Sequence, residues 1–544
     1  MTYQRDQLPS QPTTINRRDF LKKVSAGAIF LPGVASFLAA CTDDQTAGTT
    51  VGTATTTTGA PGTTTTTAPR DTGITGLLRV ANPGEPNFID PANALEVTEF
   101  AIIRNVYDGL LLWNADYTAL VPGLALSWES NDEATEWVFN LREGVSFHDG
   151  STFNSSVARK TIEYYLDKEW GFVAAGLQEV DDSDPAVLRV LFSDASPDFA
   201  RNQAAVMYMM SPMLIDEDAA GERAVGTGPF RFAAWNPGES VVLEANEDYW
   251  GEGPFLETVE LQNIADQTAA ITALRAGDID LVLKVPPRQV AEFRQDANFG
   301  VSTTNSWTEG HLLFRTDQTP TDDVLVRQAI AYAIDRESIV ENVLLGEAVV
   351  ANTPLPPGTY GAVDPPTGYT HDPDMARKLL SDAGLDGLEL RMSVFAAIRV
   401  LGEEVSQAIV GQLAEAGINV ALDIQEAGVA VTDLIADEPE HQLFHVEYGY
   451  DTGGPLHFTL GSALGHPRYD GEELNSLIQQ VSTTPDGPDR MQALAEAQDV
   501  FMRELPHLPL YHLNLSDVFR ADLEGYTVPK DGYQPVLKRA SFRS

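Results

Sequence analysis

Leu77-Leu-Arg-Val80 opens the stretch that decides the fold, and Glu96-Val-Thr-Glu-Phe-Ala-Ile-Ile-Arg-Asn-Val-Tyr-Asp-Gly-Leu-Leu-Leu112 follows it. The first segment is a short apolar run typical of a strand, and in the second apolar residues recur at helical spacing. We therefore predict a strand at 77–80 and a helix at 96–112. Trp137-Val-Phe-Asn-Leu141 alternates apolar and polar side chains and predicts another strand.

Helical spacing of apolar residues continues along the chain. It predicts helices at 268–276, 323–345, 374–383 and 403–416. Gly417 directly after the last of these favours a left-handed C-terminal cap. Strands that alternate with helices indicate an α/β protein, and the chain from Ile74 to Ser544 is long enough for two or three domains with their own cores.

The N-terminal residues have the pattern of an export signal. Arg17 and Arg18 precede an uncharged segment at 24–40, as in a twin-arginine signal, and Leu38-Ala-Ala-Cys41 resembles a lipobox with the only cysteine of the chain. Residues 1–41 are therefore predicted to direct export, and a lipid on Cys41 to anchor the product to the outer face of the cell membrane. A retained membrane-spanning helix is the alternative.

A threonine-rich segment follows the lipobox. Threonine occupies 15 of the 31 positions from Thr42 to Thr72, and apolar side chains are almost absent. Such a composition cannot bury a core, so we predict a disordered stalk at 42–73 that carries the folded part away from the membrane.

Charge and cysteine content exclude several classes of partner. The chain carries 79 Asp and Glu against 35 Lys and Arg, and the first 40 residues have a small positive net charge, so the excess of acid lies in the rest. This balance excludes nucleic acid and anionic lipid as partners of the folded part. With one cysteine, no disulfide can form within the chain.

A series of short motifs runs through the chain in a constant order. They are Phe88-Ile-Asp-Pro91, Val106-Tyr-Asp-Gly-Leu-Leu111, Val121-Pro-Gly-Leu-Ala125, Leu141-Arg-Glu-Gly-Val145, Phe147-His-Asp-Gly150, Val225-Gly-Thr-Gly-Pro-Phe230, Asn246-Glu-Asp-Tyr-Trp250, Ala273-Leu-Arg-Ala-Gly-Asp-Ile-Asp280, Val326-Arg-Gln-Ala-Ile330 and Leu508-Pro-Leu-Tyr511. Together they resemble the family 5 extracellular solute-binding proteins, the oligopeptide- and dipeptide-binding receptors of ABC importers. We expect most of these motifs to be structural, with Gly226, Gly228 and Pro229 at a tight turn and Trp128, Trp137 and Trp250 in the core.

The resemblance implies an α/β fold of the two-lobed periplasmic-binding-protein type, a type II clamp. Lobe I would comprise 74–308 and 509–544, with an extra subdomain at about 114–222, and lobe II would comprise 309–508. The two crossovers, near 310–315 and 508–514, would form the hinge. The expected partners are a small-molecule or peptide ligand and an ABC permease with its ATPase, and the protein is expected to be a monomer without a cofactor or a bound metal.

The resemblance also implies a ligand-binding segment in lobe II, Glu447-Tyr-Gly-Tyr-Asp-Thr-Gly-Gly-Pro-Leu-His-Phe458. Asp451 falls where the family anchors the α-ammonium group of a peptide, and a carboxylate in a closed cleft suits that role. Tyr448 replaces the family's Trp, while Gly449, Tyr450 and His457 complete the predicted contacts. A turn aspartate before two glycines is the alternative for Asp451.

On the facing lobe, Ala94-Leu-Glu-Val-Thr98 matches the segment that pairs with an extended peptide through its backbone. The predicted contacts are thus Ala94, Leu95, Glu96, Val97 and Thr98. Backbone pairing accepts any side chain and suits broad specificity. Arg399 or Arg391 is the candidate partner for a ligand carboxylate.

The sequence offers only weak signals for a metal site or an enzyme. His441 and His445 lie four residues apart but lack the glutamate of a metalloprotease, and in a strand they would be too far apart to share a metal. No catalytic motif stands out, so we expect no enzyme. A non-peptide solute such as an oligosaccharide, a nickel complex or haem, with His445 or His457 near it, is an alternative, and so is a sensor subunit.

Overall fold

The computed structural model describes residues 74–543, with gaps at 95–96, 115–116, 167, 169–173, 218–220, 222, 366, 386, 396–400, 450–467 and 533–535. The predicted signal and stalk lie outside the described residues, so the roles of Arg17, Arg18 and Cys41 stay predictions. Among the described residues, no helix is both long and apolar enough to cross a membrane.

One large mixed sheet runs through both halves of the molecule. Its strands, in spatial order, are β15 (Asn419–Gln425), β14 (Glu389–Phe395), β16 (Leu443–Gly449), β12 (Phe299–Phe314), β17 (His507–Arg520), β11 (Leu281–Val282), β1 (Leu77–Asn82), β10 (Thr258–Asn263), β9 (Ser240–Ala245) and β8 (Phe230–Asn236), with β13 (Ala348–Val350) paired to β17. The pairs of β14 with β15 and β16, and those of β1 with β10 and β11, are parallel, whereas β10, β9 and β8 pair antiparallel at the other end of the sheet. Helices fill most of the connections, which is the pattern of an α/β fold.

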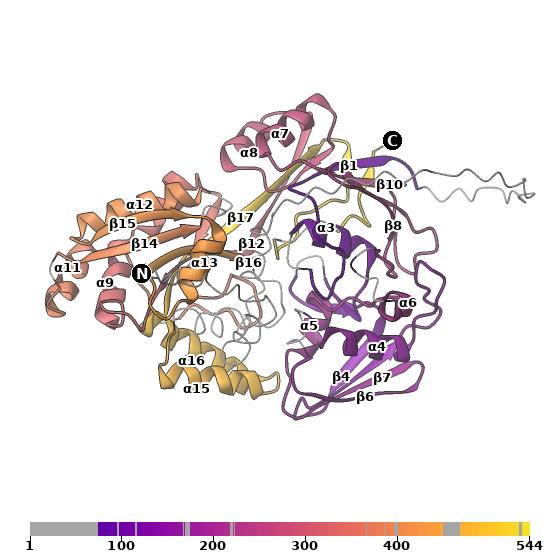
Figure 1. Cartoon of the computed structure of the whole chain (residues 1–544), viewed down its shortest axis with the longest axis horizontal. Helices are drawn as coiled ribbons and strands as arrows, with labels where there is room; N and C mark the ends of the chain where they lie inside the picture. The colour runs from indigo at the N-terminus through magenta and orange to yellow at the C-terminus, as the bar shows by residue number, and fades with distance from the viewer. Residues whose placement is uncertain are drawn as a thin grey trace, which may run out of the picture.

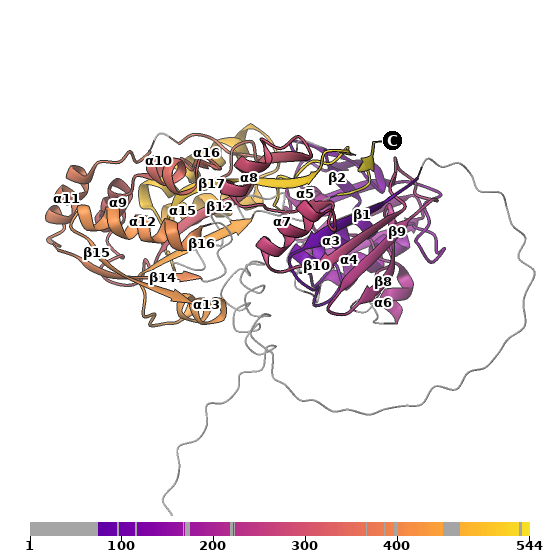
Figure 2. The ribbon, with the colours of Figure 1, turned by 90° about the horizontal axis from the view of Figure 1, so that it is seen from above.

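Two lobes lie on either side of the long strands β12 and β17 (Figure 1). The helices of lobe I are α3 (Val97–Val106), α4 (Ser155–Tyr165), α5 (Phe199–Ala205), α6 (Pro212–Asp216), α7 (Gln267–Ala276) and α8 (Pro287–Phe293). The helices of lobe II are α9 (Val324–Ala333), α10 (Arg336–Ser338), the π-helical turn η2 (Ile339–Val343), α11 (Pro373–Asp382), α12 (Gly402–Glu415), α13 (Ala427–Ile435), α15 (Glu472–Thr483) and α16 (Pro488–Glu504). Seen from above, the lobes lie side by side along the longest axis (Figure 2).

Smaller sheets belong to lobe I. A four-stranded sheet of β4 (Ala125–Ser130), β5 (Glu136–Leu141), β7 (Val187–Phe192) and β6 (Leu177–Asp184) falls within the range predicted for the extra subdomain. Two-stranded pairs join β2 (Leu111–Trp113) to β3 (Leu120–Pro122) and β18 (Leu523–Glu524) to β19 (Ser541–Phe542).

Each lobe has its own apolar core. Lobe I contains a large cluster around Phe100, Phe139 and Phe230 and a smaller one under α7 and α8, whereas the cluster of lobe II surrounds Ile330 and Phe501. The returning strand β17 contributes to both lobes, because Leu510, Tyr511 and Leu513 pack in lobe II while Val518 packs in lobe I. The exact boundaries predicted for the lobes stay predictions.

The predicted hinge segments lie within one antiparallel strand pair. Residues 310–314 belong to β12, with Arg315 directly after it, and residues 508–514 belong to β17; the pairing of these strands shifts register between Asn305 and Glu309 and again between Gly310 and His311. Irregularities of this kind locally bend and twist a sheet. They occur where the pair passes from lobe I to lobe II.

Most predicted elements are confirmed, including the strands at 77–80 and 137–141 and the helices at 268–276, 374–383 and 403–416. Gly417 adopts the left-handed conformation expected of a C-terminal cap. Two predicted helices were too long. The first ends at Val106 rather than at 112, because the Val106 carbonyl accepts a hydrogen bond from the backbone N–H of Gly228 at 2.9 Å.

The second overlong helix is interrupted after Ala333. Ile334 is extended, and the carboxylate of Asp335 accepts a 2.8 Å hydrogen bond from the Ser338 N–H, which starts the short helix α10. The helical spacing of apolar residues therefore continues past the end of α9, although Asp335 caps a new helix there.

The family motifs are largely structural, as expected. The buried carboxylate of Asp108 accepts hydrogen bonds from Thr227 at 3.0 Å, Trp250 at 2.8 Å and Tyr249 at 3.2 Å, so three motifs distant in sequence meet. Burial raises the pKa of Asp108 against the opposing effect of these donors. A Cβ at Gly226 would lie 2.1 Å from the Val106 carbonyl oxygen, so this glycine is required by close packing rather than by a left-handed backbone.

Candidate functional site

The predicted ligand-binding segment continues from the carboxyl end of β16. This strand ends at Gly449, which pairs with Thr308 of β12. Its parallel neighbour β14 ends at Phe395 on the same edge of the sheet. In open α/β sheets, ligands bind outside the carboxyl ends of parallel strands, where the chain reverses its strand order.

Both of these strand ends lead into residues with a predicted role. The segment after β14 carries Arg399, and the segment after β16 carries Tyr450, Asp451 and His457. These four lie outside the described residues, as do Leu95 and Glu96. Tyr448 and Gly449 are the last two residues of β16. Their roles therefore stay predictions.

A buried hydrogen-bond network supports this end of β16 from one face of the sheet. Tyr511 donates its hydroxyl proton to Glu447 at 2.9 Å and lies 3.2 Å from Nε2 of His445, whose Nδ1 is 2.7 Å from the hydroxyl of Ser406. Burial, followed by the neighbouring His311, lowers the pKa of His445 to about 3. The neutral ring thus has both nitrogens engaged within the protein, which argues against the alternative role of His445 in binding a nickel complex or haem.

His441 lies outside β16 and faces other partners. Its ring nitrogens are 2.5 Å from Asp433 and 2.8 Å from Asp423. His441 and His445 are therefore each committed to separate neighbours. Arg391 is likewise engaged on lobe II, because its guanidinium is 2.7 Å from Asp423 and 3.2 Å from Glu440. This argues against Arg391 as the partner of a ligand carboxylate.

The predicted peptide-pairing segment of lobe I differs from expectation in its backbone. Val97 and Thr98 form the first turn of α3, and the N–H of Ala94 donates to the Asp90 carbonyl at 2.9 Å. An extended ligand cannot form a strand ladder with residues in a helix. Val97 and Thr98 therefore do not offer an extended edge, and their contact with a ligand stays a prediction.

Three aromatic rings that the sequence did not single out lie beside this part of the sheet. Trp307 of β12 contacts Trp113 and Tyr117 of lobe I edge-on, with ring centroids 5.9 and 5.6 Å apart. Trp307 is buried, whereas the other two are partly exposed. Trp307 directly precedes Thr308, the partner of Gly449, so these rings form an apolar wall near the end of β16.

A second junction joins the lobes at a distance from the hinge strands. The inter-lobe cluster consists of Asp198 and Arg201 from lobe I and Tyr360, Asp486 and Arg490 from lobe II. Arg201 is 2.5 Å from Asp486, and Arg490 is 2.6 Å from Asp198. The Arg201 guanidinium also lies over the Tyr360 ring, 3.7 Å from its centroid. In Figure 1 the hairpin of α15 and α16 points from lobe II toward the part of lobe I that contains α5.

The cluster is well satisfied electrostatically. Asp486 accepts hydrogen bonds from Tyr360 at 2.9 Å and from Arg490 at 2.6 Å, in addition to the pair with Arg201. Burial acts to raise the pKa of Asp486, but the two guanidinium groups outweigh it and keep the pKa below its ordinary value. No sequence pattern predicted this cluster, because its members come from three segments far apart in the chain.

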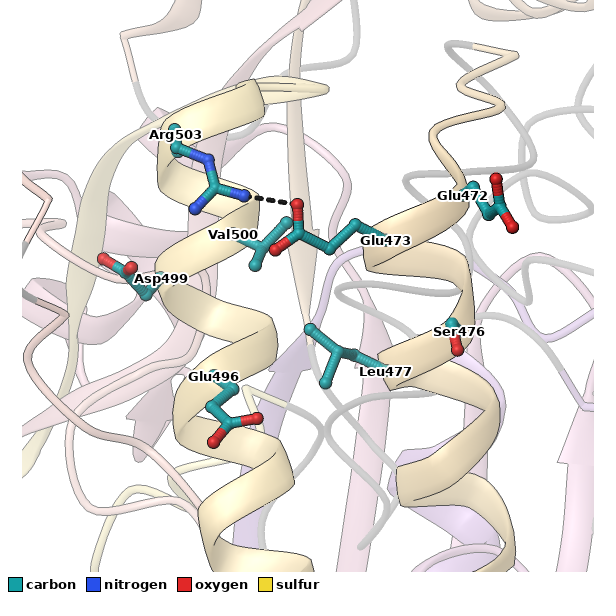
Figure 3. A pocket seen from close by; sticks show the side chains of 8 residues that line it. All are labelled: Glu472, Glu473, Ser476, Leu477, Glu496, Asp499, Val500 and Arg503. Atoms are coloured by element: carbon teal, nitrogen blue, oxygen red, sulfur yellow. Dashed lines mark hydrogen bonds and ion pairs between the residues drawn. The ribbon is translucent and has the colours of Figure 1, made fainter.

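A hollow of about 710 Å³ lies on lobe II between α15 and α16 (Figure 3). Its lining is acidic, with Glu472, Glu473, Glu496 and Asp499 around a single cation, Arg503, which is 2.6 Å from Glu473. All of these residues come from the two helices of one lobe. The hollow is therefore separate from the inter-lobe junction.

Comparison with known proteins agrees with this architecture. The family model described as bacterial extracellular solute-binding proteins, family 5 middle, matches residues 119–466. The dipeptide-binding protein of Escherichia coli (strain K12) is 24% identical over 469 residues, which cover 78% of this chain and 86% of that protein. Heme-binding protein A of Haemophilus influenzae is 25% identical over 496 residues, covering 82% and 89%.

Among solved structures, a periplasmic binding protein associated with an ABC transporter of Helicobacter pylori, in complex with the peptide STSA, superposes with a TM-score of 0.74. It is 22% identical and covers 87% of this chain and 99% of its own, so it shows that the two-lobed fold is shared. With a family model matching well over half of its length, the chain belongs to the family 5 bacterial extracellular solute-binding proteins.

Proposed function

We propose that this protein captures a peptide between its two lobes outside the cytoplasm and delivers it to the permease of an ABC importer. The observation that carries the proposal is the inter-lobe cluster, which joins the lobes across the molecule from β12 and β17. Two lobes connected by two strands and touching at a second junction can enclose a ligand between them. Ligand binding then favours the closed form.

The proposed binding region lies between the hinge strands and the inter-lobe cluster. Asp451 would pair with the α-ammonium group of the peptide, and Arg399 with a carboxylate. Both follow the carboxyl ends of neighbouring parallel strands, which supports a shared location. Trp113, Tyr117 and Trp307 would provide apolar surface for side chains of broad type.

A peptide is the proposed solute because the chain is similar to a dipeptide-binding protein over most of the length of both proteins. A haem-binding relative of equal similarity makes a non-peptide solute the second candidate. The family's members are binding proteins of transport systems, and we propose that this chain likewise performs no catalysis. A role as a sensor subunit is another alternative. It differs from a transport role in the partner protein, which would be a kinase rather than a permease.

Attachment to the membrane through a lipid on Cys41 completes the proposal. The twin arginines and the lipobox support export and anchoring, and the threonine-rich stalk supports presentation of the folded part away from the bilayer. Replacing Cys41 by Ser should release the protein into the soluble fraction of its native host. Retention of the variant in the membrane fraction at the wild-type level would contradict lipid anchoring.

The function is tested first by mass spectrometry of small molecules that co-purify with the protein, and then by titration calorimetry. For a peptide ligand, Asp451→Asn keeps the shape of the side chain but removes the counter-charge of the ammonium group. Truncating one partner of a buried charge pair costs about 2 to 5 kcal/mol, so affinity should fall roughly 30- to 4000-fold.

Two controls give this result its meaning. Asp437→Asn makes the same change at an exposed position of lobe II and should leave affinity unchanged. Acetylating the amino group of the peptide should weaken binding to the wild type about as much as the Asp451 substitution does. If Asp451→Asn binds within about threefold of wild type, the aspartate serves a turn instead, because Asn suits the same turns.

A further inference from the structure

A cluster of one carboxylate and three imidazoles lies on one face of the hinge strands. Glu309 and His311 are two residues apart in β12, so their side chains point to the same face, and His507 and His512 come from β17. The strand register places Glu309 opposite His512 and Leu313 opposite His507, so all four side chains lie on the same face. Their exposed fractions are 0%, 1%, 2% and 0% in the order Glu309, His311, His507, His512.

The potential ligand atoms of this cluster are close together. Glu309, His311 and His507 each offer one atom within 4.8 Å of the other two. Nδ1 of His311 is 3.1 Å from Oε1 of Glu309, and Nδ1 of His512 is 3.6 Å from Oε2 of the same carboxylate. Donor atoms around a tetrahedral zinc ion at about 2.05 Å lie about 3.3 Å apart, so shifts of about 1.5 Å or less would bring the ligand atoms of Glu309, His311 and His507 to this spacing.

Two of the histidines, His507 and His512, form no hydrogen bond through their ring nitrogens with the described residues. Both ring nitrogens of His507, and both of His512, are buried without a hydrogen-bond partner among these residues. Buried polar atoms nearly always have a partner, and exceptions often mark a bound ion or water. His441 and His445 provide the contrast within the same lobe, since each has both ring nitrogens within hydrogen-bond distance of side chains.

A simple packing role explains these rings less completely. His507 does contact His311 and Phe501 edge-on, with centroids 4.6 Å away in each case. An apolar side chain would make such contacts without burying two polar nitrogens.

We propose that Glu309, His311 and His507 bind a divalent zinc ion, with His512 adjacent as the fourth ligand. Imidazole nitrogens with one carboxylate oxygen are ligands that zinc prefers, and a closed set of four is typical of a structural site. A carboxylate partly balances the charge of the ion in this buried position. The ion would join the two hinge strands, where they enter lobe II.

The zinc proposal does not rest on the proposed solute-binding function, although Glu309 pairs with Tyr448 of the predicted ligand-binding segment. The zinc site lies on the opposite face of the strands from Tyr511, whose hydroxyl contacts Glu447 and His445. The residues of the inter-lobe cluster do not contribute to it. Loss of zinc binding would therefore leave the assignment as a solute receptor untouched, and failure of that assignment would leave the zinc site untouched.

The test begins with the full folded protein, purified without a histidine tag. After removal of metal with a chelator, we expect it to bind one zinc ion per chain in the presence of excess Mg²⁺, as measured by calorimetry and elemental analysis. X-ray absorption at the zinc edge should show imidazole ligands. Binding only to the many surface carboxylates would show oxygen ligands alone, and that result would overturn the proposal.

Two substitutions identify the ligands. Glu309→Gln keeps the shape of the side chain, and His507→Leu removes both orphaned nitrogens; each should weaken zinc binding by about 10- to 100-fold or more. His371→Gln, at a partly exposed histidine beside Asp335, is the control and should bind as the wild type does. Unchanged zinc affinity in both test variants would overturn the assignment. If a variant does not fold, the absorption spectrum of the wild type still decides the question.

Discussion

β12 and β17 join the lobes through paired backbone, whereas the inter-lobe cluster joins them through charged side chains. The strand pair runs from Phe299 opposite Arg520 to Leu313 opposite His507, with apolar cores of both lobes packed around it. The cluster consists of two ion pairs across the lobes and one cation–π contact. The two junctions therefore resist separation to different degrees.

The difference has a physical origin. Opening the strand pair would replace its backbone hydrogen bonds by hydrogen bonds to water and would expose buried apolar surface, and exposing that surface costs free energy. Separating the ion pairs of the cluster lets water solvate the freed charges, and Arg490 keeps its partner Asp486 within lobe II. We infer that the strand pair is the permanent connection and the cluster the one that opens.

Of the two junctions, the strand pair should show the larger effect when it is disturbed. Replacing Gly310 by Ala would place a Cβ 2.4 Å from Cζ of Tyr511, a ring that is fully buried and anchored through its hydroxyl to Glu447. Overpacking of this kind costs about 1 to 3 kcal/mol. The free energy of unfolding from urea titrations should fall by that amount.

Gly411→Ala is the matched control for this measurement. Gly411 lies on the exposed side of α12 with no atom within 4 Å of the added Cβ. Alanine is preferred over glycine inside a helix by about 0.5 to 1 kcal/mol, so this variant should be as stable as wild type or slightly more so. Equal stability of both variants would mean that the backbone of β12 or the Tyr511 ring shifts at little cost to accommodate the added methyl group.

An intermediate effect is expected at the junction that opens. Arg201→Gln removes a cross-lobe ion pair and the contact with Tyr360 while leaving each lobe's core intact. Closure should become less favourable by about 1 to 2 kcal/mol, which lowers ligand affinity by roughly 5- to 30-fold. Small-angle scattering should show a larger radius of gyration at a fixed, subsaturating ligand concentration.

Arg189→Gln controls for the loss of a positive charge on lobe I. Arg189 pairs with Glu136 at 2.8 Å on the exposed surface of the small four-stranded sheet. Such pairs contribute little, so affinity should stay within about twofold of wild type. Equal losses of affinity in both variants would assign the effect to net charge rather than to the inter-lobe cluster.

The smallest predicted effect is the pH dependence of closure. The pKa of Asp486 is held below its ordinary value by Arg201 and Arg490. A depressed pKa in the closed form adds stability above the ordinary pKa, and this stability is lost as the pH falls through the closed-form pKa. Affinity should therefore be flat at neutral pH and decline only below about pH 4. The decline should be shallower in Arg201→Gln, and an identical profile in both proteins would rule out this origin.

Local patterns predicted individual elements well where local interactions determine them. The helix at 403–416 ends at Gly417 as expected, because a left-handed cap is a property of a few consecutive residues. The helix predicted at 96–112 was too long because Gly228, more than a hundred residues away, provides the hydrogen bond that ends it at Val106. The break at Asp335 did carry a local signal, a capping residue within the apolar pattern.

The candidate site was predictable only in part. The segment around Asp451 was identified through the resemblance to a family, and the structure adds that β16 and β14 run in parallel toward the predicted segments. The aromatic wall around Trp307 had no signal, because its three rings come from separate elements. The spacing of Glu309 and His311, two residues apart in a strand, hinted that they share a face. Which histidines of β17 lie beside them depends on the register between the two strands.

The sequence by itself determined the family, the α/β class, the acidic character and most helices and strands, since these follow from composition, short-range periodicity and ordered motifs. Only the tertiary structure decided which side chains meet across the lobes and on the hinge strands. Arg201 and Asp486 are 285 positions apart, and Glu309 and His512 are brought together by strand pairing. Contacts between distant segments depend on how whole elements pack, and no local pattern of residues encodes that packing.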